Sequence, residues 1–226
     1  LLYDCGSRYP GLGLRAIPDA MRALGVRSVP RAIVSHPNTD HLNALPDCTR
    51  RLGVREVVVG EAMRTHAEIA PDGAPAYFLR AMDEQGVTVR TTHAGETIEL
   101  GERVFEILSP RSGRYFQSAN DNSLVLSVRV PTEQGDVRVL LTGDIERGAI
   151  AEILDEHPDL RADVMEVPHH GSARPSAMAF VESLDPSIAL QSTGPSRLDD
   201  ERWDLVREGR AWPVTARDGA ISVTIN

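Results

Sequence analysis

The sequence contains no lysine. All 24 of its basic residues are arginine, 33 residues are acidic, and the formal net charge is −9. Broad, non-specific binding to duplex nucleic acid needs basic patches that neutralise phosphates, so this composition argues against it. It leaves open a phosphodiester substrate that metal ions hold in a groove.

Long apolar segments are missing too. No run approaches the roughly 20 residues that a helix needs to span a bilayer, and no signal peptide is visible. The chain begins inside an apolar strand at Leu1 rather than at Met, so we expect a fragment of a longer protein or a processed form. With 41% hydrophobic residues, residues 1–226 are expected to form one domain with a substantial core.

Cysteine is scarce. Cys5 and Cys48 lie far apart and no CxxC pattern occurs, which excludes a multi-thiolate zinc site built from these residues alone. A disulfide between them is possible, but we favour two reduced, buried thiols that act as small hydrophobic residues.

The pattern of apolar residues and turn signals predicts a mixed α/β protein, with strand–helix units at both ends of a run of strands. We expect strands at residues 1–4, 31–35, 55–59, 87–91, 97–100, 104–108, 123–130, 137–142, 164–167, 187–191, 213–216 and 221–225. We expect helices at residues 14–24, 42–52, 75–85, 145–156, 176–184 and 199–208, several of them closed by a glycine. Residues 36–41 are expected to form a loop.

Histidine and aspartate residues follow three of these strands. In the first group, His36, Asp40 and His41 share one turn directly after the strand 31–35. Nitrogen ligands beside a hard oxygen ligand suit Zn²⁺ or Mn²⁺. A single histidine is more often structural than a ligand, but this grouping favours a metal site.

The second group is Thr142-Gly143-Asp144, which follows the strand 137–142. Asp144 precedes a predicted helix, so taken alone it is better explained as a helix N-cap. Beside the other two groups it becomes a candidate ligand, and its two oxygens could bridge two metal ions.

The third group is His169-His170-Gly171-Ser172, after the strand 164–167. Adjacent side chains of an extended chain point in different directions, so one imidazole could coordinate a metal while the other contacts substrate or a ligand. Gly171 would allow close backbone approach, and Ser172 could donate to a phosphate. A polar turn without function is the alternative.

The remaining polar candidates are weaker. Asn120-Asp121-Asn122-Ser123 is explained either by turn chemistry or by a side chain that reaches the active site. Three other histidines have no partner nearby in the sequence and are expected to be structural or exposed: His66, His93 and His157.

These motifs, in this order, resemble the metallo-β-lactamase superfamily, and in particular the C-terminal metallohydrolase domain of bacterial ComEC-type DNA-uptake proteins. The likeness is carried by Asp4-Cys5-Gly6 and by residues 36–41, 120–126, 141–144, 167–172 and 215–221. It spans nearly the whole chain, although the β-hairpin that opens the family's fold has no counterpart before the strand that ends at Asp4.

The resemblance implies an α/β fold of the αββα sandwich type, lacking part of the N-terminal hairpin, with a di-metal site between the sheet edges. Zinc or manganese is the implied metal. Carried onto this chain, the first metal falls to His36 and Asn38, the second to Asp40 and His41, the bridge to Asp144, and the remaining ligand to His169 or His170. The His36/Asn38 site is expected to be weaker, because Asn38 offers a neutral amide where the family has His or Asp.

The implied function is a metal-dependent phosphodiesterase or nuclease, in which the metal lowers the pKa of bound water towards about 7. Asp40 and Asp144 are the expected catalytic carboxylates, and Ser172, Asn120 and Asn122 the expected contacts to phosphate. Single-stranded DNA or another phosphodiester is the implied substrate. By resemblance the domain is tethered to a membrane DNA-uptake channel and lies outside the cytoplasm; a cytoplasmic location is the alternative.

Two departures from the family favour a different function. One is Asn38, and the other is residues 192–198, which lack a late histidine that could donate a proton to the leaving oxygen. A degenerate domain that keeps the fold but little or no catalysis, and that serves as a binding or structural module of an uptake protein, is the main alternative. Hydrolysis of thioesters or lactones is a third.

Overall fold

The computed structural model describes residues 1–7 and 11–225, and these form two compact units. The first unit comprises the described residues up to His93 together with residues 112–115, and the second comprises residues 94–111 and the chain from Phe116 onward. Each unit contains one β-sheet and one large apolar core. Among the described residues, none of the helices is both long and apolar enough to traverse a bilayer.

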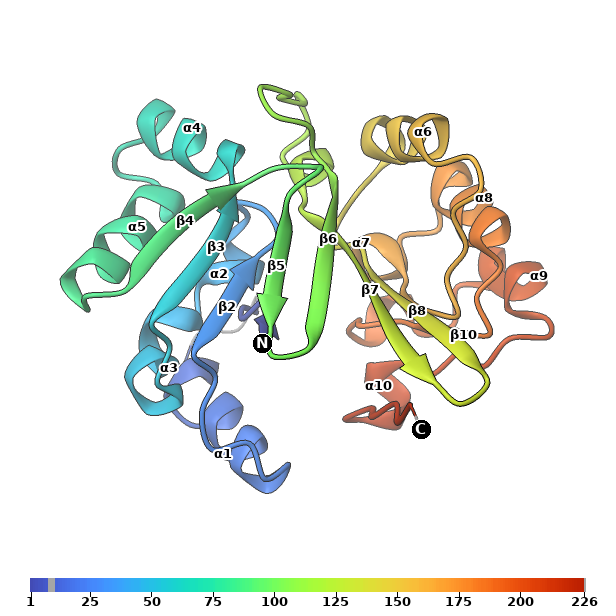
Figure 1. Ribbon diagram of the computed structural model, residues 1–226, viewed down its shortest axis with the longest axis horizontal. Helices are drawn as coiled ribbons and strands as arrows, with labels where there is room; N and C mark the ends of the chain where they lie inside the picture. The colour runs from blue at the N-terminus through green and yellow to red at the C-terminus, as the bar shows by residue number, and fades with distance from the viewer. Residues whose placement is uncertain (8–10, 226) are drawn as a thin grey trace. The chain divides into compact units, whose positions relative to one another are not determined.

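The sheet of the first unit is entirely parallel (Figure 1). In spatial order its strands are β1 (Leu2–Tyr3), β2 (Arg31–Val34), β3 (Glu56–Gly60) and β4 (Thr88–Thr92). Parallel neighbours need crossover connections, and the segments between these strands supply η1 (Leu12–Leu14), α1 (Ala16–Ala23), α2 (Thr39–Leu42), α3 (Leu45–Leu52), α4 (Glu61–Ile69) and α5 (Ala74–Glu84).

The core of the first unit lies between this sheet and its helices. Alternate residues of the strands, such as Val34 and Val57, pack with Leu45 of α3 and with Phe78 and Met82 of α5. This alternation follows from the two-residue repeat of a strand, which points every second side chain to the same face. The helix-covered face therefore fixes the register of β2 and β3.

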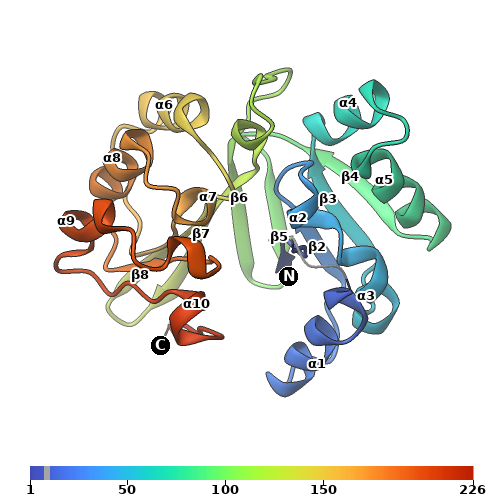
Figure 2. The ribbon, with the colours of Figure 1, turned by 180° about the vertical axis from the view of Figure 1, so that it is seen from behind.

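The sheet of the second unit is mixed, and Figure 2 labels its strands β5 to β8. A meander of antiparallel strands leads from β5 to β8. Strand β9 then pairs in parallel with β8, and β10 pairs in parallel with β9. The strands are β5 (Thr97–Leu100), β6 (Arg103–Ser109), β7 (Val125–Thr132), β8 (Gly135–Leu141), β9 (Val164–Glu166) and β10 (Ile188–Leu190).

Helices cover the parallel part of this sheet. Ile150 and Ile153 of α6 and Phe180 of α8 pack with Leu140 of β8 and Met165 of β9 in one core. The helical segments are η2 (Asn120–Asn122), α6 (Arg147–Glu156), α7 (Pro168–Gly171), α8 (Pro175–Leu184), η3 (Pro195–Arg197), η4 (Glu201–Trp203), α9 (Asp204–Arg207) and α10 (Thr215–Asp218).

Most predicted elements are confirmed, but those around residues 36–52 and several after residue 198 are partly or wholly wrong. The predicted loop 36–41 contains the helical turn α2, and the predicted helix 42–52 begins only at Leu45. The predicted helix 199–208 is split into η4 and α9. In place of the strand 213–216, Val214 makes one isolated bridge and α10 follows. Residues 221–225, which the structure describes, form no strand.

Helix α4, one of the longer helices described, was not expected. Helix α4 begins at Glu61 directly after the strand β3, with Gly60 as its N-cap and no side chain capping it. Gly60 and the acidic Glu61 in the first turn are both signals of a helix start, but the helix follows the strand with no turn between them, and the boundary was missed.

The polar groups singled out in the sequence follow strand ends, as predicted. In the first unit, Asp4 follows β1 and Ser35 and His36 follow β2. Because β1 and β2 are parallel, their carboxyl ends meet at the same edge of the sheet. In the second unit, β8 and β9 are parallel in the same way, and Asp144 and His169 follow them.

Candidate metal centre

The ligand candidates of the first unit are held by one carboxylate. Asp4 Oδ1 accepts a hydrogen bond from the Ser35 backbone N–H at 2.7 Å, and Asp4 Oδ2 accepts one from the Ser35 hydroxyl at 2.7 Å. His41 Nδ1 also lies 2.7 Å from Asp4 Oδ2. Since a carboxylate only accepts, His41 Nδ1 carries the proton and donates it. The lone pair of the His41 ring is then on Nε2.

The same count of protons determines the tautomer of His36. The Ser35 hydroxyl has a single proton, which it gives to Asp4. His36 Nδ1 lies 2.9 Å from Ser35 Oγ, so the ring nitrogen is the donor and Ser35 the acceptor. His36 therefore also presents Nε2. Metal-binding histidines are typically oriented through their other ring nitrogen in this way.

Both rings are buried and close together. His36 is 2% exposed and His41 4%, and their ring centroids are 4.1 Å apart. A ring nitrogen of His36 lies within 4.8 Å of a ring nitrogen of His41, and a carboxylate oxygen of Asp40 also lies within 4.8 Å of a ring nitrogen of His41. His36 and Asp40 thus each lie close to His41. Asn38 is the N-cap of α2, and its carbonyl accepts from the His41 N–H.

A second segment lies against the backbone of this loop. The Cys5 N–H donates to the carbonyl of His41, and the Ala44 N–H donates to the carbonyl of Cys5. Gly6 comes so close that a Cβ there would lie 2.3 Å from the carbonyl oxygen of Asp40. In the sequence, Asp4-Cys5-Gly6 stands out only through the resemblance to the superfamily. In the structure, this segment orients and supports the histidine loop.

In the second unit, Asp144 sits on a clamped loop. Glu166 Oε2, at the end of β9, accepts from the N–H groups of Thr142 and Gly143 at 3.1 and 3.0 Å. The Asp144 N–H donates to Ser123 Oγ at 3.1 Å. The Asp144 side chain is 4% exposed. Ser123 belongs to the group 120–123, which is a candidate from the sequence, whereas Glu166 was not expected to contribute, because it lies more than 20 residues away in the sequence.

The His169-His170 turn differs from the expected extended chain. His169 has φ 49° and ψ 51°, His170 has φ 54° and ψ 29°, and Gly171 has φ 73°. Three successive residues are therefore left-handed, a conformation that costs a non-glycine residue roughly 1–2 kcal/mol. Because the two side chains do not point to opposite sides of a strand, both can approach one carboxylate.

Asp144 is that carboxylate. His170 Nε2 lies 3.5 Å from Asp144 Oδ1, and His169 Nε2 lies 3.9 Å from Asp144 Oδ2. His170 Nδ1 is 3.0 Å from the carbonyl of Ser192, so it carries a proton and leaves Nε2 as the lone-pair atom. Two acceptors at 3.5 Å suit a cation between them, and a metal about 2.0–2.2 Å from each fits this spacing.

His169 has a second acidic neighbour. Its Nδ1 lies 3.1 Å from Glu146 Oε1, which in turn contacts Arg174 Nε at 3.3 Å. Burial lowers the pKa of His169 below its usual value, and this effect exceeds the opposing influence of the carboxylates of Asp144 and Glu146. A neutral ring keeps the lone pair that a metal requires.

The residues predicted to contact phosphate form hydrogen bonds that support their own loops. The Asn122 amide is fully buried and bonds the backbone of Phe116 on both its oxygen and its nitrogen, and also the carbonyl of Ser118. The carbonyl of Asn120 accepts from the Ser123 hydroxyl. Ser172 follows the left-handed turn, and its backbone N–H donates to the carbonyl of His169.

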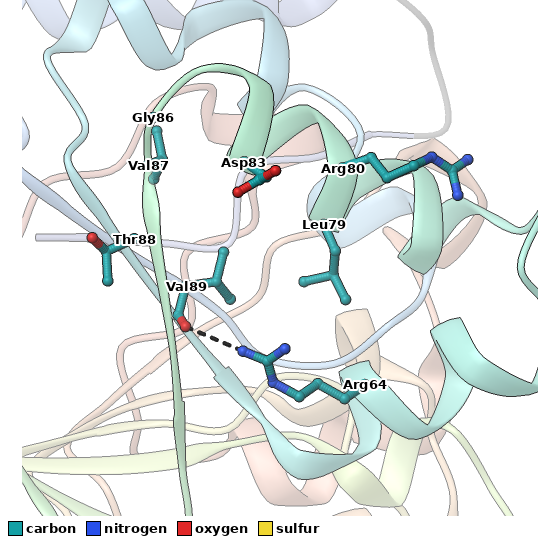
Figure 3. Close-up of a pocket in the computed structure, with 8 residues that line it drawn as sticks. All are labelled: Arg64, Leu79, Arg80, Asp83, Gly86, Val87, Thr88 and Val89. Atoms are coloured by element: carbon teal, nitrogen blue, oxygen red, sulfur yellow. Dashed lines mark hydrogen bonds between the residues drawn. The ribbon is translucent and has the colours of Figure 1, made fainter.

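A pocket of about 620 Å³ lies elsewhere, in the first unit beside α4, α5 and β4 (Figure 3). Its wall includes Leu79, Val89 and Asp83. Arg64, which also lines it, donates to the Val89 carbonyl. With one carboxylate and no histidine, the lining lacks the donor set of the two histidine groups and does not resemble a metal site.

We expect Asp4→Asn to weaken zinc binding by roughly 10–100-fold, the usual effect of losing a carboxylate that orients a histidine ligand. A neutral amide cannot accept from Ser35 and His41 with the strength of a carboxylate. Competition with a chromogenic chelator measures the affinity. Asp19→Asn, on the exposed part of α1, is the matched control. Equal affinity of Asp4→Asn and wild type would refute the assigned role of Asp4.

Gly6→Ala should both destabilise the chain and weaken metal binding, because the new methyl group meets backbone that cannot move aside. Overpacking of this kind costs roughly 1–3 kcal/mol. Gly194→Ala is the control, since a Cβ there meets no atom within 4 Å. Thermal unfolding and zinc titration of both variants provide the measurement; indistinguishable melting temperatures would show that the segment has room to adjust.

Sequence comparison finds relatives among much longer proteins. No family model matches the chain. ComE operon protein 3 of Bacillus subtilis is 27% identical over 183 residues, which is 81% of this chain and 22% of that protein. YcaI, an uncharacterised protein of Escherichia coli, is 30% identical over 118 residues, 49% of this chain and 15% of that protein. The chain thus spans about a fifth or less of the length of these relatives.

Among solved structures, the similar folds are metallo-β-lactamases. The β-lactamase from Chitinophaga pinensis has a TM-score of 0.54 and 17% identity, covering 81% of this chain and 78% of that one. The class B3 di-zinc enzyme LRA-12 from an Alaskan soil metagenome has a TM-score of 0.52 and 18% identity, with coverage of 81% and 79%. The Rm3 enzyme has a TM-score of 0.51 and 16% identity, with coverage of 91% and 84%. The predicted fold class is confirmed: this chain has the metallo-β-lactamase fold, and its sequence resembles ComE operon protein 3.

Proposed function

We propose that the chain is a metal-dependent phosphodiesterase with a di-metal centre, as the resemblance of its motifs implies. By that resemblance, His36 and Asn38 would hold the first metal and Asp40 and His41 the second, and Asp144 would be the carboxylate that serves both. His170 is the favoured remaining ligand, because its Nδ1 is anchored on the Ser192 carbonyl. One observation carries the proposal: Asp4 and Ser35 fix both His36 and His41 in the tautomer that presents Nε2.

The remaining residues have roles that follow from their contacts. A bound divalent metal lowers the pKa of water and so supplies a nucleophile at neutral pH. Asp40 orients that nucleophile as well as binding metal. Ser172 and Asn120 contact phosphate oxygens; Asn122 is the weaker candidate, because its amide is used by the backbone of Phe116 and Ser118.

The proposed substrate is single-stranded DNA during uptake by a membrane channel. The support is the similarity to ComE operon protein 3, which covers most of this chain, and the likeness of its motifs to ComEC-type proteins. The net charge of −9 without lysine gives little grip on a duplex, where many phosphates must be neutralised at once. In this setting the domain is tethered to the channel outside the cytoplasm.

A degenerate module is the second candidate. It is favoured by Asn38, a weak ligand, and by residues 192–198, which contain no histidine to protonate a leaving oxygen. Metal content of protein purified without chelator separates the two functions. Two equivalents of zinc or manganese support the hydrolase, whereas folded protein without metal supports the module.

If the chain is a hydrolase, it should cleave bis-p-nitrophenyl phosphate with added Mn²⁺ or Zn²⁺, and Asp144→Ala should abolish the activity. The nitrophenolate group leaves without a proton, so the missing late histidine matters little for this substrate. DNA should be cut more slowly, because its alkoxide leaving group needs protonation. Single strands should be cut faster than duplex, because an acidic chain offers little grip on a duplex. Asp155→Ala, on the exposed side of α6, controls for general effects. Doubly metal-loaded, folded protein that cuts neither substrate would favour the module.

The two metals should differ in affinity. We expect crystals soaked in Mn²⁺ or Zn²⁺ to fill the Asp40/His41 site before the His36/Asn38 site, because the Asn38 amide brings no charge. Asn38→Asp should strengthen the first site by adding a carboxylate. Anomalous scattering at the metal edge reports the occupancy of each site. Equal filling of the two sites in the unaltered chain would contradict this ranking.

A further inference from the structure

The two cysteines of the chain meet inside the first unit. Cys5 follows Asp4 on the segment that supports the histidine loop, and Cys48 lies on α3. Their sulfur atoms are 3.6 Å apart, although 43 positions separate the residues in the sequence. Both side chains are buried, Cys5 at 4% and Cys48 at 0% exposure. They are the only cysteines in the sequence, so neither has a competing intramolecular partner.

We propose that Cys5 and Cys48 are a modification site at which an intramolecular disulfide forms. Bond formation requires the sulfur atoms to approach to about 2.05 Å, a movement of the order of 1.5 Å that side-chain rotation and a small shift of α3 can share. This inference concerns the first unit alone and does not depend on the proposed hydrolase activity.

The oxidant is a disulfide, either a small one such as glutathione disulfide or that of a thiol–disulfide oxidoreductase. One cysteine thiolate attacks it, forming a mixed disulfide and releasing one reduced thiol. The second cysteine thiolate then attacks the cysteine sulfur of that mixed disulfide and releases the second thiol. The two cysteines lose two electrons and two protons, and the oxidant gains them.

The bond would act on the metal loop through the backbone. The Cys5 N–H donates to the carbonyl of His41 at 2.9 Å, and the Cys5 carbonyl accepts from Ala44 at 3.1 Å. Asp4, immediately before, holds Ser35 and His41. A covalent link from Cys5 to α3 therefore pins the segment that orients His41, while leaving the ligands themselves unaltered.

Burial decides when the bond forms. A reagent in solution reaches neither sulfur in the folded unit without local opening, so the exchange occurs mainly while the chain folds. Once formed, the bond is shielded from reductants for the same reason. The pair is thus a lasting cross-link that an oxidising compartment installs, rather than a rapidly reversible switch.

The test is to refold the full chain in glutathione buffers, one oxidising and one reducing, and to compare the products by intact mass and by thiol labelling in denaturant. We expect the oxidised product to have lost two hydrogen atoms, to contain no free thiol and to melt roughly 5–15 °C higher, as closure of a loop of this length implies. It should also bind zinc at least as tightly as the reduced form, measured by chelator competition. The oxidised, folded product should resist reductant until it is denatured.

Cys48→Ala and Cys5→Ala refolded in the same oxidising buffer are the controls, and neither should show the rise in melting temperature. If either variant fails to fold, the comparison of oxidised and reduced wild type still decides. Wild type that keeps both thiols, or that acquires only glutathione adducts, overturns the proposal. So does a disulfide form that melts lower than the reduced form or loses zinc affinity.

Discussion

A single carboxylate organises the first unit around its histidines. Asp4 accepts from the Ser35 backbone, the Ser35 hydroxyl and His41 Nδ1, so both its oxygens are committed to one loop. The strand before it, β1, is only two residues long, yet pairing with β2 is enough to bring Asp4 to the loop. Without this carboxylate, His41 Nδ1 would lose its acceptor at 2.7 Å, and Ser35 would lose the acceptor that turns its lone pair toward His36.

The second unit uses the same physical device on its own loop. Glu166 accepts from the backbone N–H groups of Thr142 and Gly143. At the start of α6, Asp121 accepts from three backbone N–H groups, those of Glu146, Gly148 and Ala149. Charge-assisted bonds of this kind are stronger than bonds between neutral groups. Carboxylates outside the set of ligand candidates thus hold the backbone on either side of Asp144.

Local patterns in the sequence predicted what depends on neighbouring residues. Apolar runs located most strands, and polar residues at their ends located His36, His41 and Asp144 at sheet edges. The supporting residues could not be found in this way, since Asp4 acts on His41 and Glu166 on Thr142 across stretches whose spacing carries no signal. The left-handed turn at His169 and His170 was missed because neither residue is the glycine that usually marks such a conformation. That the two groups of ligands bind one pair of metals stays a prediction.

That turn has an evolutionary consequence. Glycine at position 169 or 170 would adopt the observed backbone angles without the steric cost that an imidazole-bearing residue incurs there. The carbonyls of the turn would still be held, by Arg197 at His169 and by Trp203 at Gly171. A lineage selected only for a robust fold would therefore drift toward glycine at these two positions. If both histidines are nevertheless retained in such a lineage, selection is acting on their side chains rather than on the fold.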